Sequence, residues 1–212
     1  MQMNRPKYIH FSVLFFSIWL SSCVLPESTH IVPDYYLLSP IIEDTNFTDV
    51  DLNKSFYIRE VEIPEFLKDS RMALKPNSHS IEFRETERWG EPLSDGIARV
   101  VALNLSRSLE TPFFSIFPNR RERELVWDVS LSFSSFVVVE SKYAEVSTIW
   151  EISNSINKKV QRGSSTIHWD LDSNNSHSII EEVGGLNQSL HKLASQFSNL
   201  IEGELKQTGK QN

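Results

Sequence analysis

The sequence predicts a single α+β domain, in which a largely antiparallel sheet carries two main helices on one face. Segments of alternating apolar and polar residues, typical of strands, lie before residue 90 and again after residue 126. Two segments with apolar residues every three or four positions, typical of helices, span residues 91–110 and 177–207. Strands grouped around two helices, with short connections in the second group, favour a layered α+β arrangement.

Size and composition support one globular domain. The chain has 212 residues, of which 40% are hydrophobic, 23% charged and 11% aromatic, so it has enough apolar surface to form a core. The formal net charge of −7 argues against general binding of nucleic acid. No nucleic-acid partner is therefore expected.

Four short strands are expected in the first half of the chain. The sequence "YYLLSP", residues 35–40, reads as the first strand, and residues 56–64 alternate, although neither side of that segment is cleanly apolar. Residues 72–76 and 80–85 predict two more strands around the turn "KPNS".

The first helix is predicted over residues 91–110. Pro92 suits a first turn, and the carboxylates of Glu91 and Asp95 suit the positive end of the helix dipole. The apolar residues at helical spacing are Leu93, Ile97, Val100, Val101, Leu105 and Leu109.

Three strands with short connections are expected after residue 126, which predicts an antiparallel meander. Ser134–Ser135 breaks the alternation of the first of them and indicates a bulge or bend. The third strand, in "KKVQRGSSTIHWDLD", is the weakest pattern. The inward positions of the first two strands are Trp127, Val129, Leu131 and Phe133, then Ala144, Val146, Thr148, Trp150 and Ile152.

The chain ends in a long amphipathic helix. Because each glycine inside a helix is about 1 kcal/mol less favourable than alanine, Gly184–Gly185 predicts a bend or a break. The apolar stripe of this helix consists of Ile179, Val183, Leu186, Leu190, Leu193, Phe197, Leu200, Ile201 and Leu205.

Residues 1–22 are expected to be a signal peptide. Arg5 and Lys7 give a basic start, no acidic residue occurs in the first 22 positions, and residues 11–20 form an apolar run. That run is shorter than the roughly 20 residues that span a bilayer. A structural helix of the mature domain is the alternative, which the lack of a polar face and of a cap disfavours.

Cys23, the only cysteine, follows this segment in "LSSC". The stretch resembles the lipobox of bacterial lipoproteins, with Leu20 at −3 and Ser22 at −1, and the resemblance implies an N-acyl, S-diacylglycerol cysteine. A thiolate is nucleophilic enough to form the thioether, and more than one acyl chain gives stable anchoring. The alternative is a secreted protein with a free thiol. Residues 23–34 then read as a lipidated tether, and Val24, which is not an aspartate, points to the outer membrane.

The sequence contains little that indicates catalysis. The histidines show no metal-ligand spacing, and no G-x-S-x-G elbow or phosphate-binding glycine loop is present. His168, Asp170 and Asp172 project to one side of a strand and could hold a divalent cation, but the polar face of an edge strand is the favoured interpretation. We therefore expect no metal, no cofactor and no enzymatic activity.

Three motifs resemble the auxiliary lipoproteins of ABC-type intermembrane transport, the paraquat-inducible (Pqi-type) lipoprotein family. Phe66 stands where the family more often has tyrosine, and Gly90 where alanine is usual. The matching residues are Tyr35, Tyr36 and Leu38; then Val61, Ile63, Pro64, Phe66 and Leu67; and finally Arg88, Trp89, Pro92 and Leu93.

The resemblance implies a family domain over residues 35–208 in an outer-membrane lipoprotein that faces the periplasm. Such a protein works with an MCE-domain (mammalian cell entry) protein and an ABC transport system, on phospholipid or another hydrophobic cargo, and a homo-oligomer is compatible with this role. A lipid-anchored hydrolase that uses His168 and Asp170, and a scaffold for outer-membrane assembly, are the alternatives.

The resemblance also makes Arg88, Trp89, Pro92 and Leu93 the candidate motif for a partner or for the structure. Either Arg88 and Trp89 hold a strand-to-helix corner that faces a partner, or Trp89 packs under the helix while Arg88 satisfies carbonyls or a carboxylate. The second interpretation is favoured.

Overall fold

The computed structural model describes residues 32–41, 47, 51–122, 124–172 and 178–208. The expected signal peptide and Cys23 lie outside the described residues, and the fold below is that of the compact unit Pro33–Asn212. Its strands and helices are β1 (Asp34–Tyr36), β2 (Phe56–Glu62), β3 (Arg71–Asn77), β4 (Ser80–Trp89), α2 (Leu93–Ser108), β5 (Phe114–Ile116), β6 (Trp127–Val139), β7 (Tyr143–Asn154), β8 (Val160–Asp170) and α3 (Ile179–Thr208).

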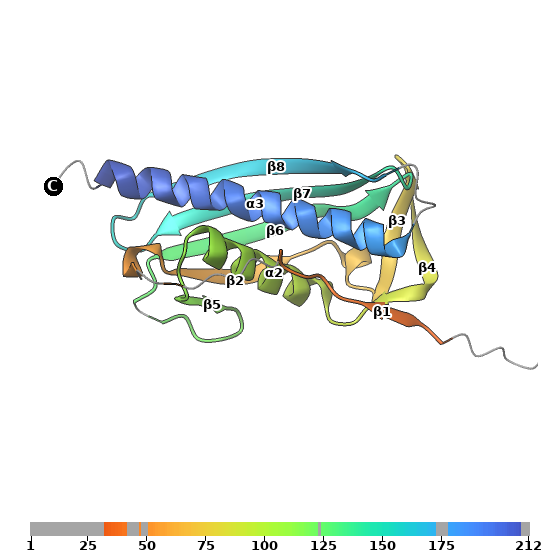
Figure 1. Ribbon diagram of the computed structural model, residues 1–212, viewed down its shortest axis with the longest axis horizontal. Helices are drawn as coiled ribbons and strands as arrows, with labels where there is room; N and C mark the ends of the chain where they lie inside the picture. Colours follow the sequence, from red (N-terminus) through yellow and green to blue (C-terminus); the bar gives the residue numbers. More distant parts are fainter. Residues whose placement is uncertain (1–31, 42–46, 48–50, 123, 173–177, 209–212) are drawn as a thin grey trace, which may run out of the picture. The chain divides into compact units, whose positions relative to one another are not determined.

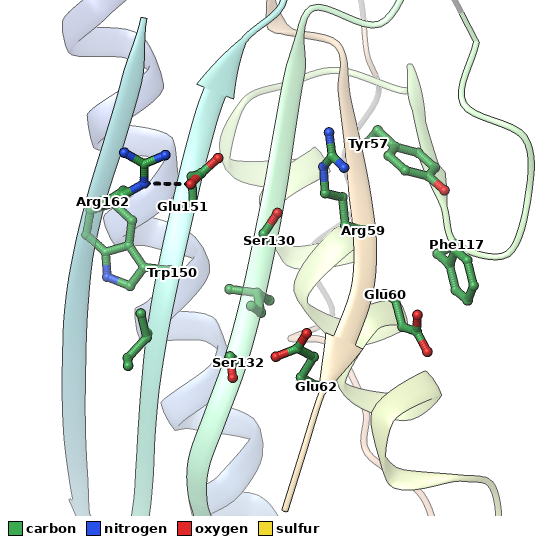
Figure 2. A pocket seen from close by; sticks show the side chains of 12 residues that line it. Tyr57, Arg59, Glu60, Glu62, Phe117, Ser130, Ser132, Trp150, Glu151 and Arg162 are labelled. Carbon is green, nitrogen blue, oxygen red and sulfur yellow. Dashed lines mark hydrogen bonds and ion pairs between the residues drawn. The ribbon is translucent and has the colours of Figure 1, made fainter.

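The described residues form one eight-stranded sheet with both helices packed against the same face (Figure 1). This confirms the predicted α+β class. Where β2, β6, β7 and β8 lie side by side, the opposite face carries exposed side chains, and the helices lie behind the strands (Figure 2). Among the described residues, no helix is both long and apolar enough to cross a membrane.

The sheet contains both parallel and antiparallel pairs, and its central strand β6 pairs with β2, β3 and β7. The expected antiparallel meander is present as β6, β7 and β8, with β7 paired along the length of β6. The other side of β6 is shared by two strands that both run parallel to it, β2 at its beginning and β3 at its end. Helix α2 lies between β2 and β6 in sequence, and parallel strands need such a crossover connection.

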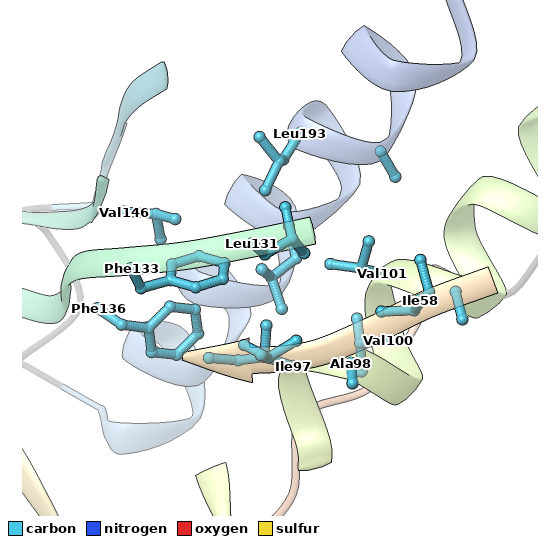
Figure 3. Close-up of a cluster of buried hydrophobic side chains, with 14 of the residues drawn as sticks. Ile58, Ile97, Ala98, Val100, Val101, Leu131, Phe133, Phe136, Val146 and Leu193 are labelled. Atoms are coloured by element: carbon cyan, nitrogen blue, oxygen red, sulfur yellow. The ribbon is translucent and has the colours of Figure 1, made fainter. Parts of the chain in front are cut away.

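The core lies between the sheet and the two helices, as Figure 3 shows for side chains of β2, α2, β6 and α3. The predicted inward positions of β6 and β7 are all buried, and the expected irregularity at Ser134–Ser135 is present as a register shift between Phe133 and Ser135. Trp150 packs edge-on against Phe197 of α3, with 5.6 Å between the ring centroids.

The uneven alternation in β2 has a structural cause. The pairing of β2 with β6 shifts its register between Ile58 and Val61, so that both residues reach the core. Because the bulge takes up the extra residue, Arg59 and Glu60 are both exposed. The strand therefore presents two consecutive charged residues to solvent.

Helix α2 begins at Leu93, two residues later than expected, and Pro92 is its N-cap. It ends where Glu110 adopts a positive φ of 56°, which reverses the chain, and the N–H of Thr111 then donates to the carbonyl oxygen of Ser106 at 2.9 Å.

A bend or a break was expected at Gly184–Gly185, and the break is wrong, because α3 continues through both residues as one helix of 30 residues. A β-carbon on Gly185 would lie 2.9 Å from Leu171 Cδ2 and 3.3 Å from Ala144 Cβ. The absence of a side chain at this position lets the helix approach the sheet closely, and the packing outweighs the low helix propensity of the pair.

The segment from Leu38 to Ile41 is fixed across both helices by side chains. Asn187 of α3 accepts from the N–H of Ser39 at 3.0 Å, and Leu38 is only 2% exposed. On α2, Arg99 donates to the Leu38 carbonyl, Asn104 accepts from the Ile41 N–H, and Arg107 donates to the Ile41 carbonyl. The chain is thus held firmly to both helices just after β1.

Candidate functional site

A broad hollow of about 570 Å³ lies over the face of the sheet that the helices do not cover (Figure 2). Its floor is the first half of β6, and its walls come from β2, β7, β8 and Phe117. The lining residues are Tyr57, Arg59, Glu60, Glu62, Phe117, Ser130, Leu131, Ser132, Ile149, Trp150, Glu151 and Arg162.

Strand alternation creates this hollow. On β6, Ser130 and Ser132 point away from the core side chains that flank them, and their small size keeps the floor low. On β7, Ile149 lies opposite Ser132 and is 65% exposed. An isoleucine at an outward position, between buried Thr148 and Trp150, leaves apolar surface in contact with water.

The charges around the hollow differ in how they are paired. Asp128, with a side chain only 11% exposed, accepts from Arg59 at 3.2 Å and from Arg121 at 2.6 Å. Across the hollow, Arg162 of β8 donates to Glu151 of β7 at 2.6 Å, as the dashed line in Figure 2 shows.

Two carboxylates at the rim remain available to a partner. Among the described residues, Glu60 and Glu62 take part in no ion pair. Both also line a second hollow of about 530 Å³, so the two hollows adjoin along the end of β2. The rim is therefore acidic where the two hollows meet.

The motif predicted from the sequence divides between this rim and the core. Pro92, which is exposed, and Leu93, which is 4% exposed, line the second hollow together with Lys68. Arg88 and Trp89 line neither of the two hollows.

Trp89 is 7% exposed, and its ring lies 6.5 Å from that of Phe136. Its backbone N–H donates to the carbonyl oxygen of Ser70 at 2.7 Å. These contacts place Trp89 in the hydrophobic core.

Arg88 lies in the middle of a row across three strands, between Tyr35 of β1 and Arg71 of β3. It makes a long hydrogen bond of 3.5 Å to Ser70 Oγ. Beside it, the hydrogen bonds from Arg71 lower the pKa of Asp69 to about 2. Arg88 is therefore half-buried at the end of β4, near the ion pair of Arg71 with Asp69, and it does not line the hollow.

The residues considered for a metal or for hydrolysis, His168, Asp170 and Asp172, are all exposed at and just after the end of β8. Within the described ranges, no cluster of three or more metal-ligating side chains is present. The carboxylate of Glu145 lies between the hydroxyl of Ser135 and the imidazole of His168. It accepts a hydrogen bond from Ser135 Oγ at 2.7 Å and lies 3.6 Å from His168 Nε2. In a Ser-His-Asp triad the imidazole is the middle group, so this arrangement cannot pass a proton from the serine to the histidine.

The residues of the larger hollow were not predicted from the sequence as a functional site. One signal was available: Ile149 is an apolar residue at an outward position of a clearly alternating strand. The pairing of Arg59 with Asp128 could not be inferred, because it depends on the parallel contact of β2 with β6.

The fold recurs in solved structures of low sequence identity. A crystal structure described only as that of an uncharacterized protein has a TM-score of 0.65 and 14% identity, covering 80% of this chain and 99% of the other. Protein XCC0632 from Xanthomonas campestris, of family DUF330, has a TM-score of 0.63 and 11% identity, covering 82% and 99%. No curated protein matches the sequence.

A family model matches residues 36–197. This range includes all residues that line the hollow, most of α3 and every strand of the sheet apart from the first residues of β1. The description of this family model is "ABC-type transport auxiliary lipoprotein component". The match covers well over half of the chain, and the chain therefore belongs to the family of ABC-type transport auxiliary lipoprotein components.

Proposed function

We propose that this lipoprotein is anchored in the outer membrane, faces the periplasm and docks an MCE-domain protein as a non-catalytic subunit of an ABC-type intermembrane transport system. The cargo would be phospholipid or another hydrophobic molecule. Membership of the transport auxiliary family supports the general role. The observation that carries the docking role is the uncovered sheet face with its broad hollow.

The surface chemistry of this face suits a protein partner. Ile149 and Phe117 expose 65% and 47% of their surfaces at the hollow, which gives apolar contact area. Around them lie the ion pair of Glu151 with Arg162 and the rim carboxylates of β2. Apolar anchors surrounded by polar groups are typical of protein interfaces.

The anchor supports the location. A diacylglyceryl group on Cys23 would place the lipid eleven residues before Asp34, and a fully extended chain of that length reaches at most about 40 Å. Such a tether keeps the domain close to its own membrane. A partner that extends from the inner membrane must then come to the domain, and an MCE-domain protein fits that requirement.

Photocrosslinking in cells tests the docking role. A photoreactive amino acid at Ile149, in the full lipidated chain, is expected to capture an MCE-domain protein. Ile180 is the matched control, since it is also an exposed isoleucine, 74% exposed, but lies in the first turn of α3. Capture at position 149 and not at position 180 is the expected result.

The other outcomes separate the alternatives. Capture of a β-barrel assembly protein at position 149 would favour the scaffold role. Equal capture at positions 149 and 180, or none at either, would remove the docking role from this face. An Ile149→Asp variant should lose copurification with the partner while keeping its melting temperature, because the side chain contributes little to the core.

A further inference from the structure

Among the strands of the described residues, β8 is the last on one side of the sheet, beyond β7 (Figure 1). Two backbone hydrogen bonds fix which of its groups face β7: Leu171 N donates to Lys142 O at 2.8 Å, and Asn154 N donates to Lys159 O at 2.8 Å. Both residue pairs continue the register of β7 with β8, in which Tyr143 lies opposite Asp170.

In an antiparallel pair, residues with inward and outward backbone groups alternate. The odd-numbered residues of β8 therefore bond to β7, and the even-numbered residues direct their N–H and C=O groups away from it. These outward groups belong to Val160, Arg162, Ser164, Thr166, His168 and Asp170, all of which are exposed.

This edge lacks the features that usually protect an edge strand. Its pairing with β7 runs from Asp170 to Val160 without a register shift, so no bulge twists the edge away. The strand contains no proline or lysine, and its middle residues, Gly163 to Thr166, carry no charge. A long, regular, exposed edge of this kind is a template for pairing with another strand.

We propose that β8 pairs antiparallel with β8 of a second copy of this chain, about a two-fold axis that passes through Thr166. In this register, Arg162 lies opposite Asp170 of the second copy, and symmetry forms the same pair twice. Opposite charges at directly facing positions stabilise a strand pair. Asp170 would thereby join the exposed ion pair of Arg162 with Glu151.

The charged residues of the strand select this register. On the helix side, Gly163 would face Trp169 of the second copy, but the Trp150 ring of the same chain already covers Gly163, so that pair does not distinguish between registers. A shift of the axis to Ser165 would instead place Arg162 opposite His168 and lose both ion pairs. The sequence of β8 therefore complements itself best about Thr166, which favours a second copy over an unrelated strand.

Cysteine crosslinking in membranes that contain the full chain tests both the pairing and its register. Facing residues of a hydrogen-bonded antiparallel pair have Cα atoms about 5.5 Å apart, within the range that a disulfide spans. Thr166→Cys should thus give a covalent homodimer on oxidation or with a short bismaleimide. Ser164→Cys and His168→Cys should each fail alone and succeed when the two variants are coexpressed.

Two comparisons serve as controls. The unaltered chain shows whether Cys23 contributes, and Ile156→Cys, at a residue 69% exposed outside β8, reports random collision. No homodimer from Thr166→Cys, or as much from Ile156→Cys, would overturn the proposal. So would a Thr166→Cys product that contains a different protein, identified by mass spectrometry, in place of a second copy.

A charge exchange tests the register without cysteine chemistry. Starting from Thr166→Cys, adding either Arg162→Asp or Asp170→Arg should reduce the crosslinked homodimer, because like charges then face each other. Adding both changes should restore it, although the total charge is unaltered. Both side chains are exposed, and thermal melts of each variant establish that the fold is retained. Failure of the double exchange to restore the homodimer would exclude this register.

Discussion

Alanine at Gly184 and alanine at Gly185 should change the stability of the domain differently, although the two residues are neighbours in α3. In the described structure, a β-carbon added to Gly184 meets no heavy atom within 4 Å. A β-carbon added to Gly185 lies 2.9 Å from Leu171 Cδ2 and 3.3 Å from Ala144 Cβ. The pair thus shares one backbone conformation and differs in its surroundings.

The magnitudes follow from two opposing effects. Replacing a glycine inside a helix by alanine stabilises the helix by about 1 kcal/mol, and nothing opposes this gain at Gly184. At Gly185 the same gain meets overpacking, which typically costs about 1–3 kcal/mol. The end of Leu171 can rotate away, but Ala144 Cβ is attached directly to the backbone of β7 and cannot. We expect Gly185→Ala to be less stable than Gly184→Ala by about 1–3 kcal/mol.

Thermal or urea unfolding of the two variants measures this difference. For a domain of this size, 1 kcal/mol corresponds to roughly 2–4 °C in melting temperature. Gly184→Ala should melt above the unaltered protein, and Gly203→Ala, whose β-carbon also has open space, should do the same. If Gly185→Ala raised the melting temperature as much as Gly184→Ala, the close approach of α3 to β7 would be refuted.

Four further predictions concern Trp89, the lipid anchor, the membrane that carries the anchor and the pKa of Asp69. Trp89→Ala should destabilise the domain by about 3–5 kcal/mol, and an unchanged melting temperature with loss of a partner would instead assign Trp89 to an interface. Cys23→Ala should leave an unlipidated, uncleaved precursor, as mass spectrometry of the N-terminus would reveal. Val24→Asp should move the protein to the inner-membrane fractions of a sucrose gradient in a host that sorts lipoproteins by that residue. If the unaltered protein were found in those fractions, the outer-membrane assignment would be wrong. The depressed pKa of Asp69, about 2, adds stability that is present above its ordinary pKa near 3.8 and is lost as the pH falls through 2. Arg71→Gln removes the guanidinium and keeps the backbone N–H of residue 71, so the pKa of Asp69, measured by NMR, should move part of the way back toward 3.8. An unmoved titration would exclude the Arg71 side chain as the main cause.

The strands and helices that local patterns describe well were predicted well. The apolar residues of β7 alternate without interruption, and all the predicted inward positions are buried. The bulge in β6 was visible as two adjacent serines in an otherwise alternating strand. Helix α3 has a continuous apolar stripe, but the effect of Gly184–Gly185 depended on what lies opposite Gly185, which periodicity does not report.

The elements that depend on distant contacts were not predictable. Strand β5 has three residues, too few to show a period, and it forms because the backbone of β2 is available beside it. In β2, the two charged residues Arg59 and Glu60 obscured the alternation, since the bulge that exposes both is defined only by the pairing with β6.

The candidate site has the same origin. Ser130, Ser132 and Ile149 belong to strands that the sequence predicted, but their outward faces form a hollow only because β2 is placed beside β6. Of the motif residues that the family resemblance singled out, Trp89 contributes to the core, while Pro92 and Leu93 lie at the rim of the second hollow.

The sequence alone determined which residues face inward on β6, β7 and the two helices, because side-chain direction repeats with the fixed periods of the backbone. It also contained the apolar leader segment and the single cysteine that predict a lipid anchor. Only the tertiary structure decided that β2 and β3 share one side of β6. For the part of the chain that the structure describes, it also decided that the helices leave the face over β6 and β7 uncovered and that β8 is the last strand on its side of the sheet. Those features depend on contacts between segments far apart in the chain, whose relative stabilities no local period encodes.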